Sequence, residues 1–177
     1  MEGEGEILGF FGFHMFTPKC HPGTERLSAE AELKEDISPV FPYVNARLRA
    51  FYNPEFPFVR FRWKEHVVTL HPHKIMVSNL RDSEQAADVL KELRLFINET
   101  WQKRNEVQPS YEVRTPPPVP EIFKRLPKTN CGQCGFPSCM AFAAALSGGD
   151  AQLEGCPPLY AEQRYERLRM ELEQLLL

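Results

Sequence analysis

The chain has 177 residues, enough for one ordinary domain or two small ones. Its hydrophobic content of 42% can form a core, and its mean hydropathy of −0.40 indicates a soluble protein. A net charge of −3 gives no basic face for nucleic acid, and no apolar run is long enough to cross a bilayer. We therefore expect a globular cytoplasmic protein with no nucleic-acid partner and no membrane span.

Residues 1–108 are predicted to form an α+β adaptor domain. Hydrophobic periodicity separates helical spacing from the alternation or short apolar runs of strands. The predicted elements, in chain order, are strands at 8–16 and 26–33, a helix at 37–50, strands at 58–63, 67–70 and 75–77, and a helix at 82–104. The order ββαβββα predicts a mixed or antiparallel sheet with both helices on one face.

Proline marks the sharpest boundary in the chain. Sixteen prolines are about twice the usual share, and residues 109–120 hold five of them, including the run 116–118. Such a run is stiff and extended, so residues 109–120 are predicted to be a semi-rigid linker. A cysteine module at 121–158 and an amphipathic helix at 159–177 follow.

Four of the five cysteines lie together behind this linker, at Cys131, Cys134, Cys139 and Cys156. Two, four and sixteen residues separate successive members, so four thiolates can reach one metal centre. A glycine follows each of the first two cysteines and another precedes the last. Glycine lets backbone N–H groups approach anionic sulfur without a side-chain clash. The pattern predicts a cubane [4Fe–4S] site, which is a net anion in either common oxidation state.

The apolar run at residues 139–146 predicts a helix beside this site. Ser138 is a favourable N-cap, and Gly148-Gly149 ends the run. The positive end of the helix dipole then favours an anion at the cysteines. The Cys156-Pro157 pair is also typical of the end of bacterial cluster-binding runs.

Other sites fit parts of the cysteine pattern. A disulfide framework needs an oxidising compartment, yet the N-terminal residues 1–6 are acidic, unlike a secretory signal. Zinc also takes four thiolates and stays an alternative, although zinc ribbons usually pair two Cys-x-x-Cys knuckles and this chain has one. A thioredoxin-type redox pair would follow a strand, whereas here a proline-rich segment precedes the cysteines.

Residues 126–143, LPKTNCGQCGFPSCMAFA, with Cys156-Pro157 behind them, resemble the [4Fe–4S] domain of several anaerobic redox proteins. These include the large subunit of the corrinoid iron–sulfur protein and the B subunit of the Rnf ferredoxin:NAD oxidoreductase complex. The resemblance implies that Cys131, Cys134, Cys139 and Cys156 are the cluster ligands. It implies no substrate, because the domain is attached to different partners. Thr129 and Asn130 also fit the family pattern, and we expect them only to shape the loop.

We expect one-electron transfer to or from a redox partner protein, which by family analogy is a corrinoid or flavin protein. Four cysteine-ligated irons leave no open coordination position, so the chain is not expected to be an enzyme. Two alternatives stay open. One is a structural or regulatory module with zinc or a redox-silent cluster. The other is an enzyme with an open iron, in which Cys156 is not a ligand.

Several other residues suggest weaker hypotheses. Cys20 lacks a placed acid–base partner and is given no role. His71 and His73 flank a predicted hairpin turn and are expected to face solvent.

The cations Lys124, Arg125 and Lys128 precede the cysteine loop. They either balance cluster charge or dock an acidic redox partner, or they form a solvated helix end. The helix at 159–177 is expected to pack on its own domain, with docking of a partner as the alternative.

Overall fold

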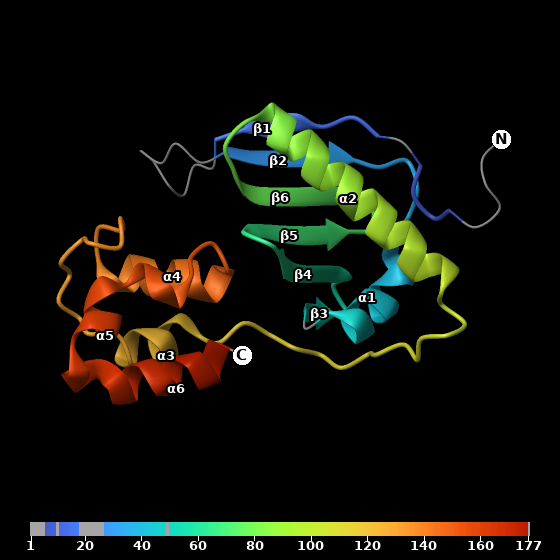
Figure 1. Cartoon of the computed structure of the whole chain (residues 1–177). Coiled ribbons are helices and arrows are strands. Elements are labelled where there is room, and N and C mark those ends of the chain that lie inside the picture. The colour runs from blue at the N-terminus through green and yellow to red at the C-terminus, as the bar shows by residue number, and fades with distance from the viewer. Residues whose placement is uncertain (1–5, 10, 18–26, 49, 177) are drawn as a thin grey trace. The chain divides into compact units, whose positions relative to one another are not determined.

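A boundary between Thr115 and Pro116 divides the chain into two units, Met1–Thr115 and Pro116–Leu177 (Figure 1). The computed structural model describes residues 6–9, 11–17, 27–48 and 50–176. Each unit has its own cluster of buried apolar side chains, as separate domains do. None of the helices in the described residues is both long and apolar enough to cross a membrane.

The first unit is built on a six-stranded antiparallel sheet with the spatial order β1-β2-β6-β5-β4-β3 (Figure 1). The strands are β1 His14–Phe16, β2 Leu27–Glu32, β3 Phe51–Asn53, β4 Phe58–Trp63, β5 His66–His71 and β6 Lys74–Leu80. Two tight hairpins connect β4 to β5 and β5 to β6, as the sequence predicts. The predicted α+β class is confirmed, and the sheet is antiparallel throughout.

One face of the sheet carries the core. Leu70 of β5 pairs with Val59 of β4 on one side and with Ile75 of β6 on the other, and all three side chains are buried. Side chains alternate between the two faces of a strand, so Thr69 and Met76 lie on the opposite face and are only partly buried. This alternation explains why the helices pack on one face of the sheet.

Two helices cover that face. The helix α1 (Phe41–Arg47), preceded by the 3-10 turn η1 (Ser38–Val40), packs on β3 and β4, and α2 (Ser83–Gln102) packs on β6 and contacts α1. Asp82 caps α2, because its carboxylate accepts a hydrogen bond from the backbone N–H of Gln85 at 2.8 Å. The predicted apolar stripe of α2 is buried at Ala86, Val89, Leu90, Leu93 and Ile97.

Two predicted elements of the first unit are wrong in extent. The strand expected at 8–16 begins only at His14, although Leu8 is fully buried. The side chain of Asn98 replaces a neighbouring strand there: its Oδ1 accepts from the N–H groups of Ile7 (3.0 Å) and Leu8 (2.9 Å), and its Nδ2 donates to the Leu8 carbonyl (2.8 Å). The helix expected at 37–50 ends at Arg47, because Leu48 is extended and the chain turns into the unpredicted strand β3.

Part of the proline-rich segment is hydrogen-bonded to the first unit. The backbone N–H of Ser110 donates to the Pro42 carbonyl at 3.0 Å, and the Asn45 side chain donates to the Ser110 and Glu112 carbonyls, each at 3.1 Å. Arg114 and Tyr52 exchange backbone hydrogen bonds at 3.1 and 3.2 Å. Residues 110–114 therefore run along the outer edge of β3.

The second unit is helical. Its helices are α3 Val119–Lys124, α4 Cys139–Gly148, α5 Pro157–Ala161 and α6 Glu166–Leu176, with 3-10 turns at η2 Leu153–Gly155 and η3 Gln163–Tyr165. The helix predicted at 159–177 is broken, because Glu162 has an extended backbone. Leu172 of α6 is fully buried among residues of α3, α4 and α5, so this helix packs on its own unit.

Candidate metal centre

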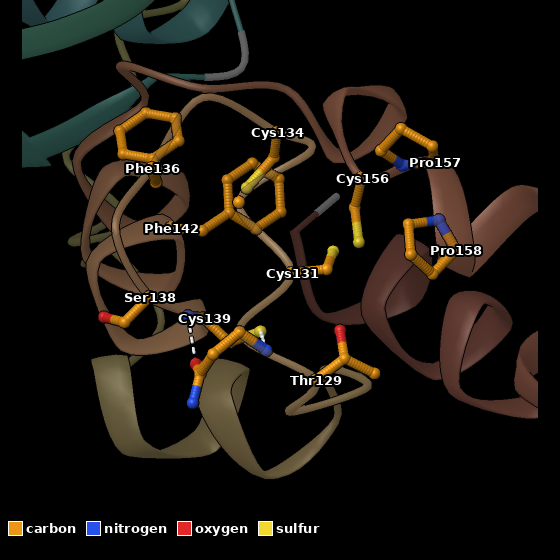
Figure 2. Close-up of a pocket in the computed structure, with 12 residues that line it drawn as sticks. Thr129, Cys131, Cys134, Phe136, Ser138, Cys139, Phe142, Cys156, Pro157 and Pro158 are labelled. Carbon is orange, nitrogen blue, oxygen red and sulfur yellow. Dashed lines mark hydrogen bonds between the residues drawn. The ribbon is translucent and has the colours of Figure 1, made fainter.

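All four C-terminal cysteines line one pocket of the second unit (Figure 2). Cys131 and Cys134 lie on the loop between α3 and α4, Cys139 is the first residue of α4, and Cys156 directly precedes α5. The four side chains reach the pocket from these different elements, and all four are free thiols (Figure 2). The structure thus brings together the residues that the sequence grouped only by spacing.

The loop before α4 repeatedly adopts left-handed backbone conformations. The φ angles are 60° at Lys128, 50° at Asn130, 71° at Gly132 and 83° at Gly135. The first three alternate with residues of ordinary negative φ. Such alternation aims successive N–H groups at one concave side, an anion-binding arrangement found at many iron–sulfur sites. Lys128 is the strained member, because a left-handed residue with a side chain costs about 1–2 kcal/mol.

The three glycines beside the cysteines are not equivalent. Gly132 and Gly135 have positive φ, so glycine is required there for its backbone freedom. Gly155 has no such φ, and a Cβ added to it would meet the Phe142 ring at 3.7 Å, an ordinary contact. Positive φ therefore explains the glycines at residues 132 and 135, and not the glycine at residue 155.

Asn130 and Ser138 fix the start of α4 at the pocket. The backbone N–H of Cys139 donates to Asn130 Oδ1 at 2.8 Å, and the N–H of Asn130 donates to Cys139 Sγ at 3.4 Å (dashed lines in Figure 2). Ser138 Oγ accepts from the N–H of Ala141 at 3.1 Å, which confirms the predicted N-cap. The N-terminal end of α4, with its positive dipole, therefore lies at the thiols.

Aromatic packing closes the inner side of the pocket. The Phe136 and Phe142 rings lie 5.5 Å apart between centroids at an interplanar angle of 53°. Phe142 is buried in the core of the second unit, and both phenylalanines line the pocket. Cys139 and Cys156 are buried in the same core, whereas Cys131 is exposed. The site therefore has an apolar, protected side and one solvent-facing thiol.

The thiols at the two ends of the sequence motif differ electrostatically. Hydrogen bonds from the Thr129 hydroxyl and then from the Gln133 backbone N–H lower the pKa of Cys131. Burial raises the pKa of Cys156, and negative charge on the other three cysteines adds to that effect. Four thiolates at this site would repel one another, and the iron cations of a bound cluster would relieve this repulsion.

Within the described residues, no three His, Cys, Asp or Glu side chains are placed to hold a single metal ion together. A cubane does not require such a meeting point, because each of its four thiolates binds a different iron. The donor set, the N–H-lined loop and the helix N-terminus all fit an anionic cluster held by cysteine.

The residues that suggested weaker hypotheses lie outside the pocket or outside the described residues. His71 and His73 lie at the β5–β6 hairpin, and burial is the main cause that lowers the pKa of His71. Lys124 pairs with Glu121 at 2.6 Å, and Arg125 pairs with Glu121 at 3.0 Å. These ion pairs neutralise part of the proposed basic patch. Cys20 lies outside the described residues.

Thr129 and Asn130 are expected only to shape the loop, and both line the pocket. Asn130 also exchanges hydrogen bonds with Cys139. For Asn130 a local signal exists, because asparagine tolerates left-handed backbone better than most residues. Its bonds to Cys139 join residues that are nine positions apart, and the hydrophobic periodicity of a sequence does not predict such bonds.

Residues 126–158 match the family model described as "Putative Fe-S cluster". Among curated relatives, subunit gamma 1 of the acetyl-CoA decarbonylase/synthase complex of Methanosarcina thermophila is 48% identical over 56 residues. The corrinoid/iron-sulfur protein large subunit of Moorella thermoacetica is 60% identical over 37 residues. The B subunit of the ion-translocating oxidoreductase complex of Rhodobacter capsulatus is 52% identical over 48 residues.

These matches cover a limited part of each protein. They span 32%, 21% and 27% of this chain, and 12%, 8% and 26% of the respective relatives. No solved structure matches the chain significantly. The matches lie in the C-terminal third, where the family model covers the loop, α4 and the last cysteine. Residues 126–158 are therefore similar to an iron–sulfur cluster domain, which confirms the resemblance expected from the sequence for this part of the chain.

Proposed function

We propose that the chain is an electron-transfer protein that holds one [4Fe–4S] cluster through Cys131, Cys134, Cys139 and Cys156. The observation that carries the proposal is that these four free thiols, from a loop and the starts of two helices, line one pocket. The pocket lies in a domain whose relatives include a corrinoid/iron-sulfur protein and an oxidoreductase subunit. Four cysteine ligands would leave no open iron position, which favours electron transfer over substrate chemistry.

When bound, the cluster supplies a one-electron redox centre. The residues of the chain hold and tune it. The thiolates bind, the N–H groups of residues 128–135 and the N-terminus of α4 stabilise negative charge, and Phe142 keeps water from the inner side. Cys131, the exposed thiol, offers a partner the shortest route to the cluster.

We further propose that the electron donor or acceptor is a separate redox protein. The similar proteins are named as subunits of multi-protein complexes, which supports a protein partner. The name of one relative, a corrinoid/iron-sulfur protein, favours a corrinoid protein as this partner, and a flavin protein is the second class that the family resemblance suggests. The first unit, which lies outside the family match, would then act as the adaptor that selects the partner.

One observation favours a second function. Cys139 and Cys156 belong to the apolar core of the second unit, so a bound metal group would also hold that core together. In a structural or regulatory module of this kind, metal loss would unfold the unit without any redox turnover. The two functions make different predictions for the same experiment.

The test is metal analysis of protein purified without oxygen, with low-temperature EPR spectra before and after dithionite. We expect about four irons and four sulfides per chain, and an EPR signal that appears on reduction. Serine replacement of each proposed ligand, one at a time, is expected to remove most of the iron or change the EPR spectrum. Cys20→Ser is the matched control and should leave both unchanged.

Three results would contradict the proposal. One zinc per chain without sulfide, persisting after iron-replete expression, would establish the structural module instead. An intact cluster with an unchanged spectrum in Cys156→Ser would show that Cys156 is not a ligand and that one iron is open to substrate. Loss of iron in Cys20→Ser would show that the ligand set is wrong.

A further inference from the structure

Asn130 donates a backbone hydrogen bond to the sulfur of one proposed cluster ligand, Cys139. The distance from the Asn130 nitrogen to Cys139 Sγ is 3.4 Å (Figure 2). The side chain of Asn130 contacts the same cysteine, because its Oδ1 accepts the hydrogen bond of the Cys139 N–H at 2.8 Å. The two bonds close a ring between the loop and the start of α4. Within this ring, the Asn130 side chain fixes the direction of its own backbone N–H.

The backbone of Asn130 explains why asparagine stands at this position. Its φ is 50°, in the left-handed region that glycine adopts freely, and Gly132 and Gly135 occupy the next two left-handed positions of the loop. Asparagine tolerates this region better than most residues with a side chain. Glycine at residue 130 would keep the turn but would have no oxygen to accept the Cys139 N–H. Asn130 therefore combines the turn with the bond that holds it.

The sulfur that receives this bond is shielded from solvent. Cys139 is 8% exposed and belongs to the apolar core of the second unit, whereas Cys131 is exposed. A hydrogen bond in apolar surroundings is electrostatically stronger than the same bond in water. Water also has little access to Cys139, so it does not readily replace the N–H of Asn130 as a donor. At this sulfur, a fixed donor has more influence than at the exposed one.

A hydrogen bond to a ligand sulfur acts differently on the two oxidation states of a cluster. Reduction adds one electron and increases the negative charge on the irons and on the sulfur atoms that bind them. A donor aimed at such a sulfur therefore stabilises the reduced state more than the oxidised state. The hydrogen bonds to the sulfurs are accordingly one of the factors that set the reduction potential.

We propose that Asn130 is a positioning residue that raises the reduction potential of the cluster by holding its own backbone N–H against the sulfur of Cys139. This inference rests on the proposed function, because it requires a redox-active cluster at the four cysteines. One electron passes from the reductant to the cluster, and Asn130 loses neither a proton nor an electron. The role of the asparagine side chain is to keep the donor in place in both oxidation states.

The experiment is a redox titration followed by EPR on the full chain, with iron and sulfide measured in every sample. Asn130→Gly keeps the left-handed turn and the N–H but removes the side chain that fixes them. Asn130→Ala removes the same side chain and also disfavours the turn. Ser147→Ala is the matched control, because Ser147 lies on α4 but donates its hydroxyl to the Pro117 carbonyl at 2.8 Å. This control loosens the same helix without touching a cysteine.

We expect Asn130→Gly to be roughly tenfold less reduced than the unmodified chain at a fixed solution potential. For a one-electron couple this is a shift of about 59 mV to more negative values. Asn130→Ala should shift the potential in the same direction and at least as far, because its N–H also loses the left-handed turn. Ser147→Ala should leave the potential unchanged.

A full cluster in Asn130→Gly with an unchanged potential would overturn the inference while leaving the proposed function intact. A shift to more positive values would also overturn it, because water entering near Cys139 would then outweigh the lost donor. Equal shifts in Asn130→Gly and Ser147→Ala would mean a general loosening of α4, again against the inference.

Two further results concern the cluster itself. If both Asn130 variants lose their iron, Asn130 serves cluster retention and the tuning role is wrong. If the unmodified chain, purified without oxygen, contains no iron or sulfide, the proposed function fails and the inference fails with it. Metal content therefore distinguishes failure of the proposed function from failure of the inference.

Discussion

Asn130 and Cys139 are joined by two hydrogen bonds of opposite direction. The Cys139 N–H donates to Asn130 Oδ1 at 2.8 Å, and the Asn130 N–H donates to Cys139 Sγ at 3.4 Å. Asn130 has a φ of 50°, so the same residue also makes a left-handed turn in the loop. The pair ties the loop that carries Cys131 and Cys134 to the first residue of α4.

Replacing Asn130 separates its side-chain role from its backbone role. Asn130→Gly keeps the left-handed conformation but leaves the Cys139 N–H without its acceptor. We expect a loss of about 1–2 kcal/mol in unfolding free energy, together with faster cluster release. Asn130→Ala should lose about 1 kcal/mol more, because alanine resists positive φ. Urea unfolding and the decay of visible absorbance measure the two effects.

Asn79→Gly is the matched control, since Asn79 is also a left-handed asparagine, with a φ of 67°, but belongs to the first unit. It should leave the rate of cluster release unchanged. Equal release rates in Asn130→Gly and Asn79→Gly would show that the bonds to Cys139 do not hold the cluster loop.

Two glycine substitutions test the backbone of the cysteine loop. Gly135→Ala forces a side chain into a φ of 83° and should destabilise the second unit by about 1–2 kcal/mol. Gly155→Ala, which meets only the Phe142 ring at 3.7 Å, should change stability by less than about 0.5 kcal/mol. Thermal unfolding and iron content of the two variants measure this contrast. Similar losses in both variants would show that the positive φ does not explain why glycine is needed at residue 135.

The Asn98 side chain should be a large contributor to the stability of the first unit. It is 4% exposed and makes three hydrogen bonds to the backbone of Ile7 and Leu8. Asn98→Ala leaves buried backbone groups without partners, and we expect a loss of about 2–4 kcal/mol in urea unfolding. Leu95→Ala on the same helix is the control, because Leu95 is 57% exposed. The iron content should stay normal in both variants, because Asn98 belongs to the first unit and the four cysteines belong to the second. A lower iron content in Asn98→Ala would contradict this separation of the two cores.

Acid should remove the contribution of Glu92 to stability. Hydrogen bonds from Lys64 Nζ at 2.8 Å and then from Trp63 Nε1 at 3.1 Å lower the pKa of this carboxyl group. A carboxyl group whose pKa is lower in the folded state stabilises the fold at pH values above its unfolded-state pKa. This stabilisation is lost as the pH falls through the folded-state pKa.

Glu92→Gln should therefore be less stable than the unmodified chain at pH 7 and equally stable in strong acid. The carboxylate is well exposed, so we expect a difference below about 1 kcal/mol at pH 7. Urea unfolding at a series of pH values measures it. A difference that stays constant with pH would show that the effect comes from packing and not from charge.

Long periodic segments were predictable from the sequence. The buried stripe of α2, the hairpins of β4, β5 and β6, and the Ser138 cap follow local patterns, and the structure confirms them. The four cysteines could be grouped because spacing alone limits how far apart they lie. Each of these features depends on residues that are near one another in the chain.

Features without a local pattern were missed. The strand β3 has three residues, too few to display alternation, and its place depends on pairing with β4 and with Arg114. The hydrogen bonds between Asn98 and Leu8 join residues that are 90 positions apart, so no periodic pattern in the sequence predicts them. The break at Glu162 divides a predicted helix because Leu159 and Leu172 both pack into the core of the second unit.

The backbone pairing of Tyr52 with Arg114 also protects the sheet from aggregation. An edge strand with free N–H and C=O groups is a template for pairing with another chain. Here both backbone groups of Tyr52 on the outer side of β3 bond to Arg114, so the chain covers this edge with its own residues. A fragment that ends at residue 108 would uncover the edge, and we expect it to self-associate. A fragment that ends at residue 115 would keep this edge covered, and we expect it to self-associate less than the shorter fragment.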